Sequence, residues 1–189
     1  GRRCLIVTDP GIVKAGLVTR ITASLDESGF SVDVCDRTEP EPRLSTYEAV
    51  LEIAQQKKPN ILVGVGGGSS LDVAKAIAKA LTCTRPLSEY LGQKFDTEGV
   101  PIITIPTTSG TAAEVTPDAV VLLPDQKVKR GMYNARATLA IVDPSMTLTL
   151  PPKVTAATGI DALSHAIESA LSRHATPLTQ ALALESVRL

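Results

Sequence analysis

The hydrophobic residues of this chain fall into two kinds of pattern. Short apolar runs with hardly any polar alternation predict strands buried on both faces, over residues 4–8, 30–35, 61–65, 102–105, 120–123 and 139–142. Apolar residues at helical spacing predict amphipathic helices over residues 14–28, 46–58 and 69–81. Strands that alternate with helices in this way predict an α/β fold with a parallel, doubly wound sheet.

The pattern changes near Pro151-Pro152, after which no strand is predicted. Two helices are expected there, over residues 154–172 and 177–189, with Pro177 at a position that favours a helix start. We therefore expect an α/β domain over residues 1–148 and the first helices of an all-α domain over residues 149–189. The chain starts without Met and its last helix has no stop signal, so we expect about half of a longer protein.

The composition of the chain excludes several classes of function. The chain of 189 residues is 43 % hydrophobic, which is enough for a packed core. Its 19 Lys and Arg balance 20 Asp and Glu, which argues against a nucleic-acid partner. No apolar run approaches the roughly 18 residues of a membrane span, and no signal peptide is visible. Three cysteines without a C-x-x-C pair do not suggest disulfides, so a cytoplasmic location is expected.

The strongest local motif is the glycine-rich turn Gly66-Gly67-Gly68-Ser69, between a predicted strand and the next helix. Glycines let the backbone approach a ligand closely, and the N–H groups at a helix start attract anions. We favour a pyrophosphate-binding site over the alternative of a tight turn in which Ser69 only caps the helix. The turn is neither the usual G-x-G-x-x-G motif, because Ser69 replaces the third glycine, nor a P-loop, because the G-K-[ST] ending is missing.

Two other polar segments follow predicted strands, at the edge where open α/β sheets bind ligands. Residues 107–116 are rich in hydroxyl side chains, and they are equally consistent with a ligand contact and a solvated loop. Asp9 ends the first strand, where its carboxylate can accept hydrogen bonds from a ribose and repel a 2′-phosphate. A turn-forming Asp before Pro10 is an equally common arrangement.

Asp161 and His165 are spaced i and i+4, so they share one face of a predicted helix. Oxygen and nitrogen donors together suit a divalent metal ion. Two ligands alone hold a metal poorly, and the spacing by itself favours an Asp stabilised by the helix dipole and a locally bonded His. His174 is expected at the surface.

Together these segments resemble the iron-containing (group III) alcohol dehydrogenase family over essentially the whole chain. Four blocks match in the family's order: Val7-Thr8-Asp9, Gly66-Gly67-Gly68-Ser69-x-x-Asp72-x-x-Lys75, Ile105-Pro106-Thr107-Thr108-x-Gly110-Thr111-x-x-Glu114-Val115-Thr116, and Pro151-Pro152 with Gly159-x-Asp161-Ala162-x-x-His165-Ala166-x-Glu168.

The resemblance implies an oxidoreductase that transfers a hydride between NAD(H) and a metal-bound alcohol, or the corresponding aldehyde or ketone. Residues 1–148 would then bind the dinucleotide. Asp161 and His165 would be catalytic as the first two ligands of a divalent metal, with Fe²⁺ expected before Zn²⁺ and further ligands expected beyond Leu189. The matched cofactor contacts are Asp9, Gly67, Gly68, Ser69, Asp72, Thr107, Thr108, Thr116, Met146 and either Lys127 or Lys129.

Asp9 favours NAD over NADP, and the partners implied are a small alcohol or aldehyde and further copies of the chain, in a dimer or larger oligomer. No membrane or nucleic-acid partner is expected. The chain departs from the family at Pro40-Glu41-Pro42, where many members carry Pro-Asn-Pro near the adenine.

Three alternatives stay open. Zinc polyol dehydrogenases of the glycerol dehydrogenase type, and relatives of dehydroquinate synthase, usually carry Lys in place of Ser69. Maleylacetate reductases usually carry Asn in place of Asp161. A non-catalytic nucleotide-binding module is the alternative of a different class for these 189 residues.

Overall fold

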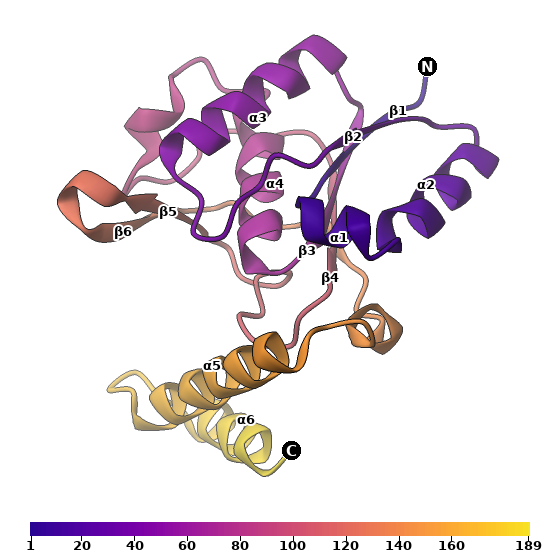
Figure 1. The fold of residues 1–189 in the computed structure, drawn as a ribbon. Coiled ribbons are helices and arrows are strands. Elements are labelled where there is room, and N and C mark those ends of the chain that lie inside the picture. Colours follow the sequence, from indigo (N-terminus) through magenta and orange to yellow (C-terminus); the bar gives the residue numbers. More distant parts are fainter.

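The computed structural model describes residues 1–189 and is built around a parallel five-stranded sheet. Its strands lie in the order β2-β1-β3-β4-β7 (Figure 1). Their bounds are β1 Arg3–Val7, β2 Ser31–Cys35, β3 Ile61–Gly66, β4 Ile102–Pro106 and β7 Leu139–Ala140. The parallel, doubly wound α/β fold predicted from the sequence is confirmed.

Helices cover both faces of this sheet. The short helix α1 (Pro10–Lys14) and α2 (Leu17–Glu27) lie on one face, and α3 (Leu44–Lys57) and α4 (Gly68–Ala80) lie on the other (Figure 1). Because side chains alternate along a strand, β1 serves two cores. Leu5 and Val7 belong to the larger hydrophobic cluster, with α3 and α4, and Cys4 and Ile6 belong to the smaller one, with α2.

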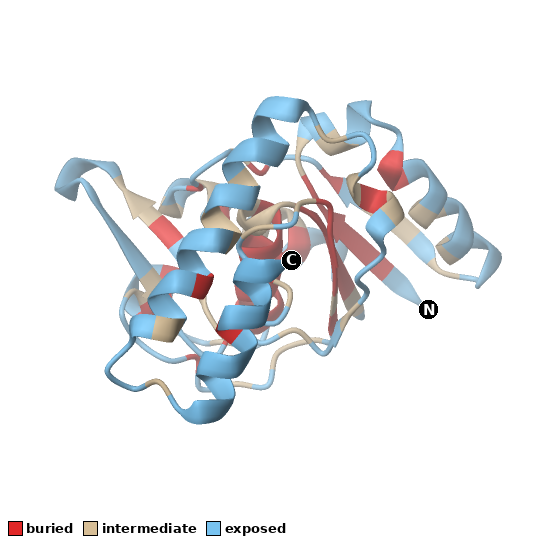
Figure 2. Cartoon of the chain, turned by 90° about the horizontal axis from the view of Figure 1, so that it is seen from below, coloured by how far each residue is buried: buried red, intermediate tan, exposed pale blue.

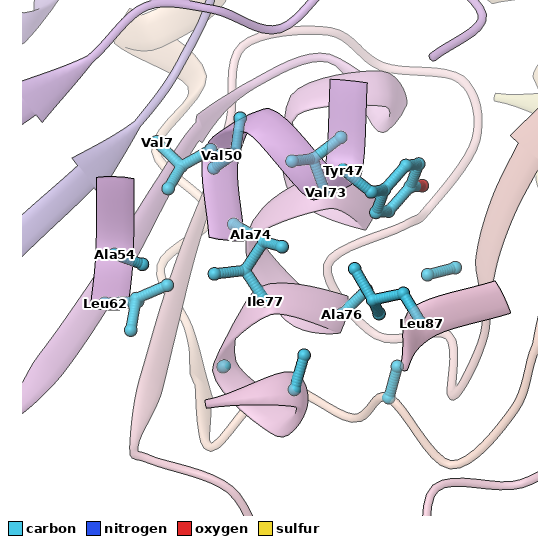
Figure 3. Packing of buried hydrophobic residues seen from close by; sticks show 14 of the residues in the cluster. Val7, Tyr47, Val50, Ala54, Leu62, Val73, Ala74, Ala76, Ile77 and Leu87 are labelled. Atoms are coloured by element: carbon cyan, nitrogen blue, oxygen red, sulfur yellow. The ribbon is translucent and has the colours of Figure 1, made fainter. Parts of the chain in front are cut away.

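The larger cluster fixes α3 and α4 against the sheet. Tyr47 and Val50 of α3 and Ile77 of α4 are fully buried. Figure 3 shows Tyr47 beside Val73 of α4, and Ala54 of α3 beside Leu62 of β3. Each such side chain contributes about 1.5–3 kcal/mol through burial. The hydroxyl of Tyr47 also donates to the Val120 carbonyl at 2.9 Å, which ties α3 to the segment beyond the sheet.

The first predicted helix is divided. The pattern predicts one helix over residues 14–28, but the chain forms α1 and α2 with a break at Gly16, whose φ is +76°. Asp9 starts α1 earlier than predicted, since its carboxylate accepts hydrogen bonds from the N–H groups of Gly11 and Ile12. The strand predicted over residues 139–142 is shorter than expected and covers only Leu139–Ala140.

The strand predicted over residues 120–123 exists as β5 (Ala119–Leu123), but its place in the parallel sheet was predicted wrongly. It pairs antiparallel with β6 (Val128–Met132) in a separate two-stranded sheet. The 3-10 turn η2 (Pro124–Gln126) joins the two strands. Lys129 and Arg130 interrupt the apolar pattern of β6, so the sequence gives no strand signal there.

The last two helices, α5 (Pro152–Leu171) and α6 (Pro177–Arg188), pack on each other and lie below the carboxyl edge of the sheet (Figure 1). Two further 3-10 turns, η1 (Leu87–Tyr90) and η3 (Pro144–Thr147), lie in connecting segments. Figure 2 shows that α5 and α6 are largely exposed, and Ala166 and Ala183 are their buried residues. None of the helices combines the length and the apolar character that crossing a membrane requires. The division after residue 148 stays a prediction.

Candidate functional site

A cavity of about 470 Å³ opens beyond the carboxyl ends of the strands. Its wall combines five parts of the chain: the segment between β2 and α3, the start of α4, the loop after β4, the β5–β6 hairpin and α5. Of the residues predicted for the site, those that line it are Gly68, Ser69, Asp72, Thr116, Lys129, Asp161 and His165. Segments as far apart in the sequence as Glu41 and His165 therefore share one space.

The strand order explains why ligand-binding residues gather here. β1 lies between β2 and β3, so the chain leaves β1 and β3 toward opposite sides of the sheet. Such a reversal leaves a crevice at the carboxyl ends, where open α/β sheets bind ligands. Asp9 follows β1 and the glycine-rich turn follows β3, and Ser70 Oγ donates to Asp9 Oδ2 at 3.2 Å.

The glycine-rich turn requires its glycines at two positions. Gly66 has φ +145°, and a Cβ there would lie 2.8 Å from the Ser70 side chain. A Cβ on Gly68 would lie 2.7 Å from Thr111 Oγ1, so the turn and the loop after β4 approach too closely for a side chain. This close approach sets the width of the cavity at the start of α4.

The start of α4 keeps its N–H groups available. The cap residue is Gly67, and no side chain caps the helix, so Ser69 is not the N-cap that the alternative interpretation required. Ser69 Oγ instead accepts the N–H of Glu41 at 3.3 Å. Its own hydroxyl proton therefore stays free to donate into the cavity, beside the positive end of the helix dipole.

A buried lysine, Lys75, organises the loop after β4. Its ammonium group is completely buried and donates to the carbonyls of Ala113 at 2.8 Å and Asp118, and to Thr116 Oγ1 at 3.2 Å. Asp72 Oδ1 lies 3.0 Å from Lys75 Nζ as an ion pair, although the angles do not make an aligned hydrogen bond.

Asp72 also anchors the hairpin, because its Oδ2 accepts the Val120 N–H at 3.0 Å. Burial raises the pKa of Asp72, and the nearby charge of Lys75 offsets only part of that shift. The sequence pattern does not predict this organising role of Lys75. The signal for it is a lysine in α4 that stands between Ala74 and Ala76, three positions after Asp72.

Thr107 and Thr108 border the glycine-rich turn without lining the cavity. The Thr107 N–H donates to the Gly66 carbonyl at 3.0 Å, and its buried hydroxyl has no hydrogen-bond partner in the protein. A Cβ on Gly67 would lie 3.3 Å from Thr108 Cγ2. Both threonines therefore lie directly beside the glycine-rich turn.

Two predicted contacts lie away from the cavity. Met146 in η3 packs into the smaller hydrophobic cluster, on the α2 face of the sheet. Lys127 sits in the hairpin turn with φ +52° and does not line the cavity, whereas Lys129 does and pairs with Glu41 Oε1 at 2.7 Å. The geometry favours Lys129 of the two lysines that the sequence left open.

Asp161 and His165 face the cavity from α5. Their Oδ1 and Nε2 atoms lie 3.7 Å apart, and both side chains are about half exposed. A contact between Gly110 and α5 sets this placement, since a Cβ on Gly110 would lie 3.0 Å from the Thr158 carbonyl oxygen. The chain holds no group of three or more His, Cys, Asp or Glu side chains that could share a metal ion. His174 is exposed, as expected.

Comparison with known proteins gives the family. The model of the iron-containing alcohol dehydrogenase family matches residues 1–144, and that of the family's C-terminal part matches residues 155–189. The chain belongs to the iron-containing alcohol dehydrogenase family. The resemblance drawn from the four sequence blocks is confirmed.

Individual members of the family match this chain in sequence and structure over nearly its whole length. A long-chain-alcohol dehydrogenase of Geobacillus thermodenitrificans is 42 % identical over 192 residues, which cover 100 % of this chain and 49 % of that protein. A crystal structure of a 1,3-propanediol oxidoreductase matches with a TM-score of 0.90 and 37 % identity, over 98 % of this chain and 49 % of that one.

A sulfoacetaldehyde reductase from Bifidobacterium kashiwanohense, solved in complex with NAD⁺, matches with a TM-score of 0.89 and 32 % identity. The match covers 99 % of this chain and 50 % of that one. The chain thus spans about half the length of its iron-containing alcohol dehydrogenase relatives.

Proposed function

We propose that this chain binds NAD(H) and supplies part of the active site of an alcohol dehydrogenase, which interconverts a small alcohol and its aldehyde or ketone. One observation carries the proposal: a single cavity joins the glycine-rich turn, Lys129 and the Asp161–His165 pair. An anion site and a pair of metal-ligating side chains in one crevice suit a dinucleotide beside a substrate. The NAD⁺ complex of the sulfoacetaldehyde reductase supports the choice of cofactor.

The chain's own groups have distinct parts in binding the dinucleotide. Free N–H groups at the start of α4 and the Ser69 hydroxyl would hold the pyrophosphate. Asp9, beside the turn, would accept hydrogen bonds from the adenosine ribose and repel a 2′-phosphate, which favours NAD over NADP. Lys129 would donate to the second ribose, and Thr107, Thr108 and Thr116 would flank the nicotinamide.

Asp161 and His165 fit a divalent cation. Their donor atoms are 3.7 Å apart, near the roughly 3.4 Å expected between two ligands of one tetrahedral ion with bonds of about 2.1 Å. Oxygen and nitrogen donors suit Fe²⁺ and Zn²⁺ alike, and membership of the family favours Fe²⁺. When bound, such an ion supplies Lewis-acid polarisation of the substrate oxygen, and the nicotinamide carries the hydride.

The second candidate is a nucleotide-binding module without catalysis. It is favoured by the lack of a third metal-ligating side chain beside Asp161 and His165. Fluorescence titration of NADH into the chain tests the binding shared by both. Gly68→Val should abolish binding, because the new side chain would collide with Thr111, whereas Gly159→Ala on the exposed face of α5 should not change it.

Turnover separates the two candidates. In the protein that contains this chain, NAD⁺-dependent oxidation of short primary alcohols should require added Fe²⁺ or Zn²⁺ and be lost in His165→Ala. NADH binding without any metal-dependent turnover would favour the module, and absence of NADH binding would exclude both.

A further inference from the structure

One ion pair bridges the rim of the cavity between two separate elements. Glu41 lies between β2 and α3, and its Oε1 is 2.7 Å from Nζ of Lys129 on β6. Both residues line the cavity, with 58 % of the Glu41 side chain and 55 % of the Lys129 side chain exposed. Exposed pairs of this kind contribute about 0.2–1 kcal/mol and weaken as salt is added. The pair is therefore a contact that a ligand can displace.

The backbone holds Glu41 at the glycine-rich turn independently of its side chain. Its N–H donates to Ser69 Oγ at 3.3 Å, and the neighbouring Pro42 carbonyl accepts the Leu122 N–H at 2.9 Å. Glu41 has φ +53°, a conformation that Asn also adopts readily. Substitutions at position 41 can thus remove the carboxylate while the segment keeps its place.

We propose that Glu41 determines how tightly the cavity holds a dinucleotide, by competing with the ligand's oxygens for the ammonium group of Lys129. The inference rests on the proposed function. In the free protein, Lys129 is neutralised by Glu41, so a ligand oxygen must first displace the carboxylate. This competition lowers affinity and speeds release of the cofactor, without blocking binding.

The test is the dissociation constant of NADH for the full chain, measured by fluorescence in the unmodified protein, Glu41→Gln and Glu41→Asn. At an ionic strength of about 0.01 M, both variants should bind about two- to five-fold more tightly. At about 1 M, where the Debye length is about 3 Å, the difference should disappear. Glu39→Gln is the matched control, because it removes the same charge from the same segment and Glu39 does not line the cavity.

A second set of variants tests the competition itself. In a Lys129→Gln background, Glu41→Gln should no longer improve binding, since there is no ammonium group left to compete for. Unchanged or weaker binding in both position-41 variants would overturn the inference and leave the proposed function intact. An equal gain with and without Lys129 would overturn it too. If neither the unmodified protein nor any variant binds NADH, the proposed function fails and the inference fails with it.

Discussion

Lys75 is a charged side chain that the fold removes completely from water. Its ammonium group holds the carbonyls of Ala113 and Asp118 and pairs with Asp72, so it fixes the loop that lines the cavity. Removing one partner of a buried ion pair costs about 3–5 kcal/mol, because the other charge is left unpaired. Lys75→Met should lower the free energy of unfolding by about this amount, measured in urea. Lys14→Met, at an exposed position with the same charge change, should leave it within about 0.5 kcal/mol.

Asp72 gives the same cluster a dependence on pH. Burial raises its pKa above the ordinary value of 3.8, with Lys75 opposing only in part, so the folded chain binds this proton more tightly than the unfolded chain does. Stability contributed by Asp72 is therefore greatest below pH 3.8 and falls as the pH rises through the raised pKa. The unfolding free energy of the unmodified chain minus that of Asp72→Asn should decline over this window and then level off. A difference that grows with pH would show that Lys75 outweighs burial.

Residues of the site differ in how far sequence could place them. Asp161 and His165 share a helix face by spacing alone, and Ser69 follows a recognisable turn. The choice between Lys127 and Lys129 depended on the register of a hairpin, in which Lys129 pairs with Leu122, and register is set by contacts that no local pattern contains. Met146 matches a cofactor position by its order in the chain, and that role stays a prediction. In the structure it packs into the smaller hydrophobic cluster, on the α2 face of the sheet.

At the scale of elements, Gly16 illustrates why the predicted first helix is two helices. The apolar spacing continues across it, but φ +76° breaks the helical backbone there. Gly16→Ala should therefore destabilise the chain by about 1 kcal/mol, since a left-handed conformation penalises a Cβ. Gly159→Ala should instead stabilise it by about 0.5–1 kcal/mol, because Gly159 lies inside α5 with open space around its Cα. Thermal unfolding compares the two, and equal effects of the same sign would contradict the argument.

The β5–β6 hairpin shows a second limit of pattern reading. Alternation and apolar runs identify strands that are buried, and β1, β3 and β4 were predicted on that basis. β6 is largely exposed, so nothing in its sequence required apolar residues. Without β6, β5 was assigned to the parallel sheet, although its partner lies outside that sheet.

At the scale of the whole molecule, stability and chemistry are divided between two parts. Both hydrophobic clusters lie entirely within residues 4–146. The α5–α6 pair supplies Asp161 and His165 to the cavity but adds only Ala166 and Ala183 to the buried residues. Many of its large apolar side chains are instead exposed: Ile160, Leu163, Ile167, Leu171, Leu178, Leu182, Leu184, Val187 and Leu189. We therefore expect the sheet with its helices to fold without α5 and α6.

This division predicts the behaviour of residues 1–148 alone. They should unfold in one cooperative transition and lose less than about 2 kcal/mol relative to the full chain, since two buried alanine methyl groups are worth about 0.8 kcal/mol each. NADH affinity should stay within about three-fold of that of the full chain, because the residues proposed to hold the pyrophosphate are retained. The lost contact between Gly110 and Thr158 should cost at most about 0.7 kcal/mol of binding free energy. Circular dichroism on heating measures the stability, and an NADH titration measures the affinity. The control is the double variant Asp161→Ala/His165→Ala of the full chain, which removes the metal-ligating side chains but keeps α5. A gradual transition would mean that α5 and α6 belong to the same folding unit as the sheet, and the division after residue 148 would then be wrong.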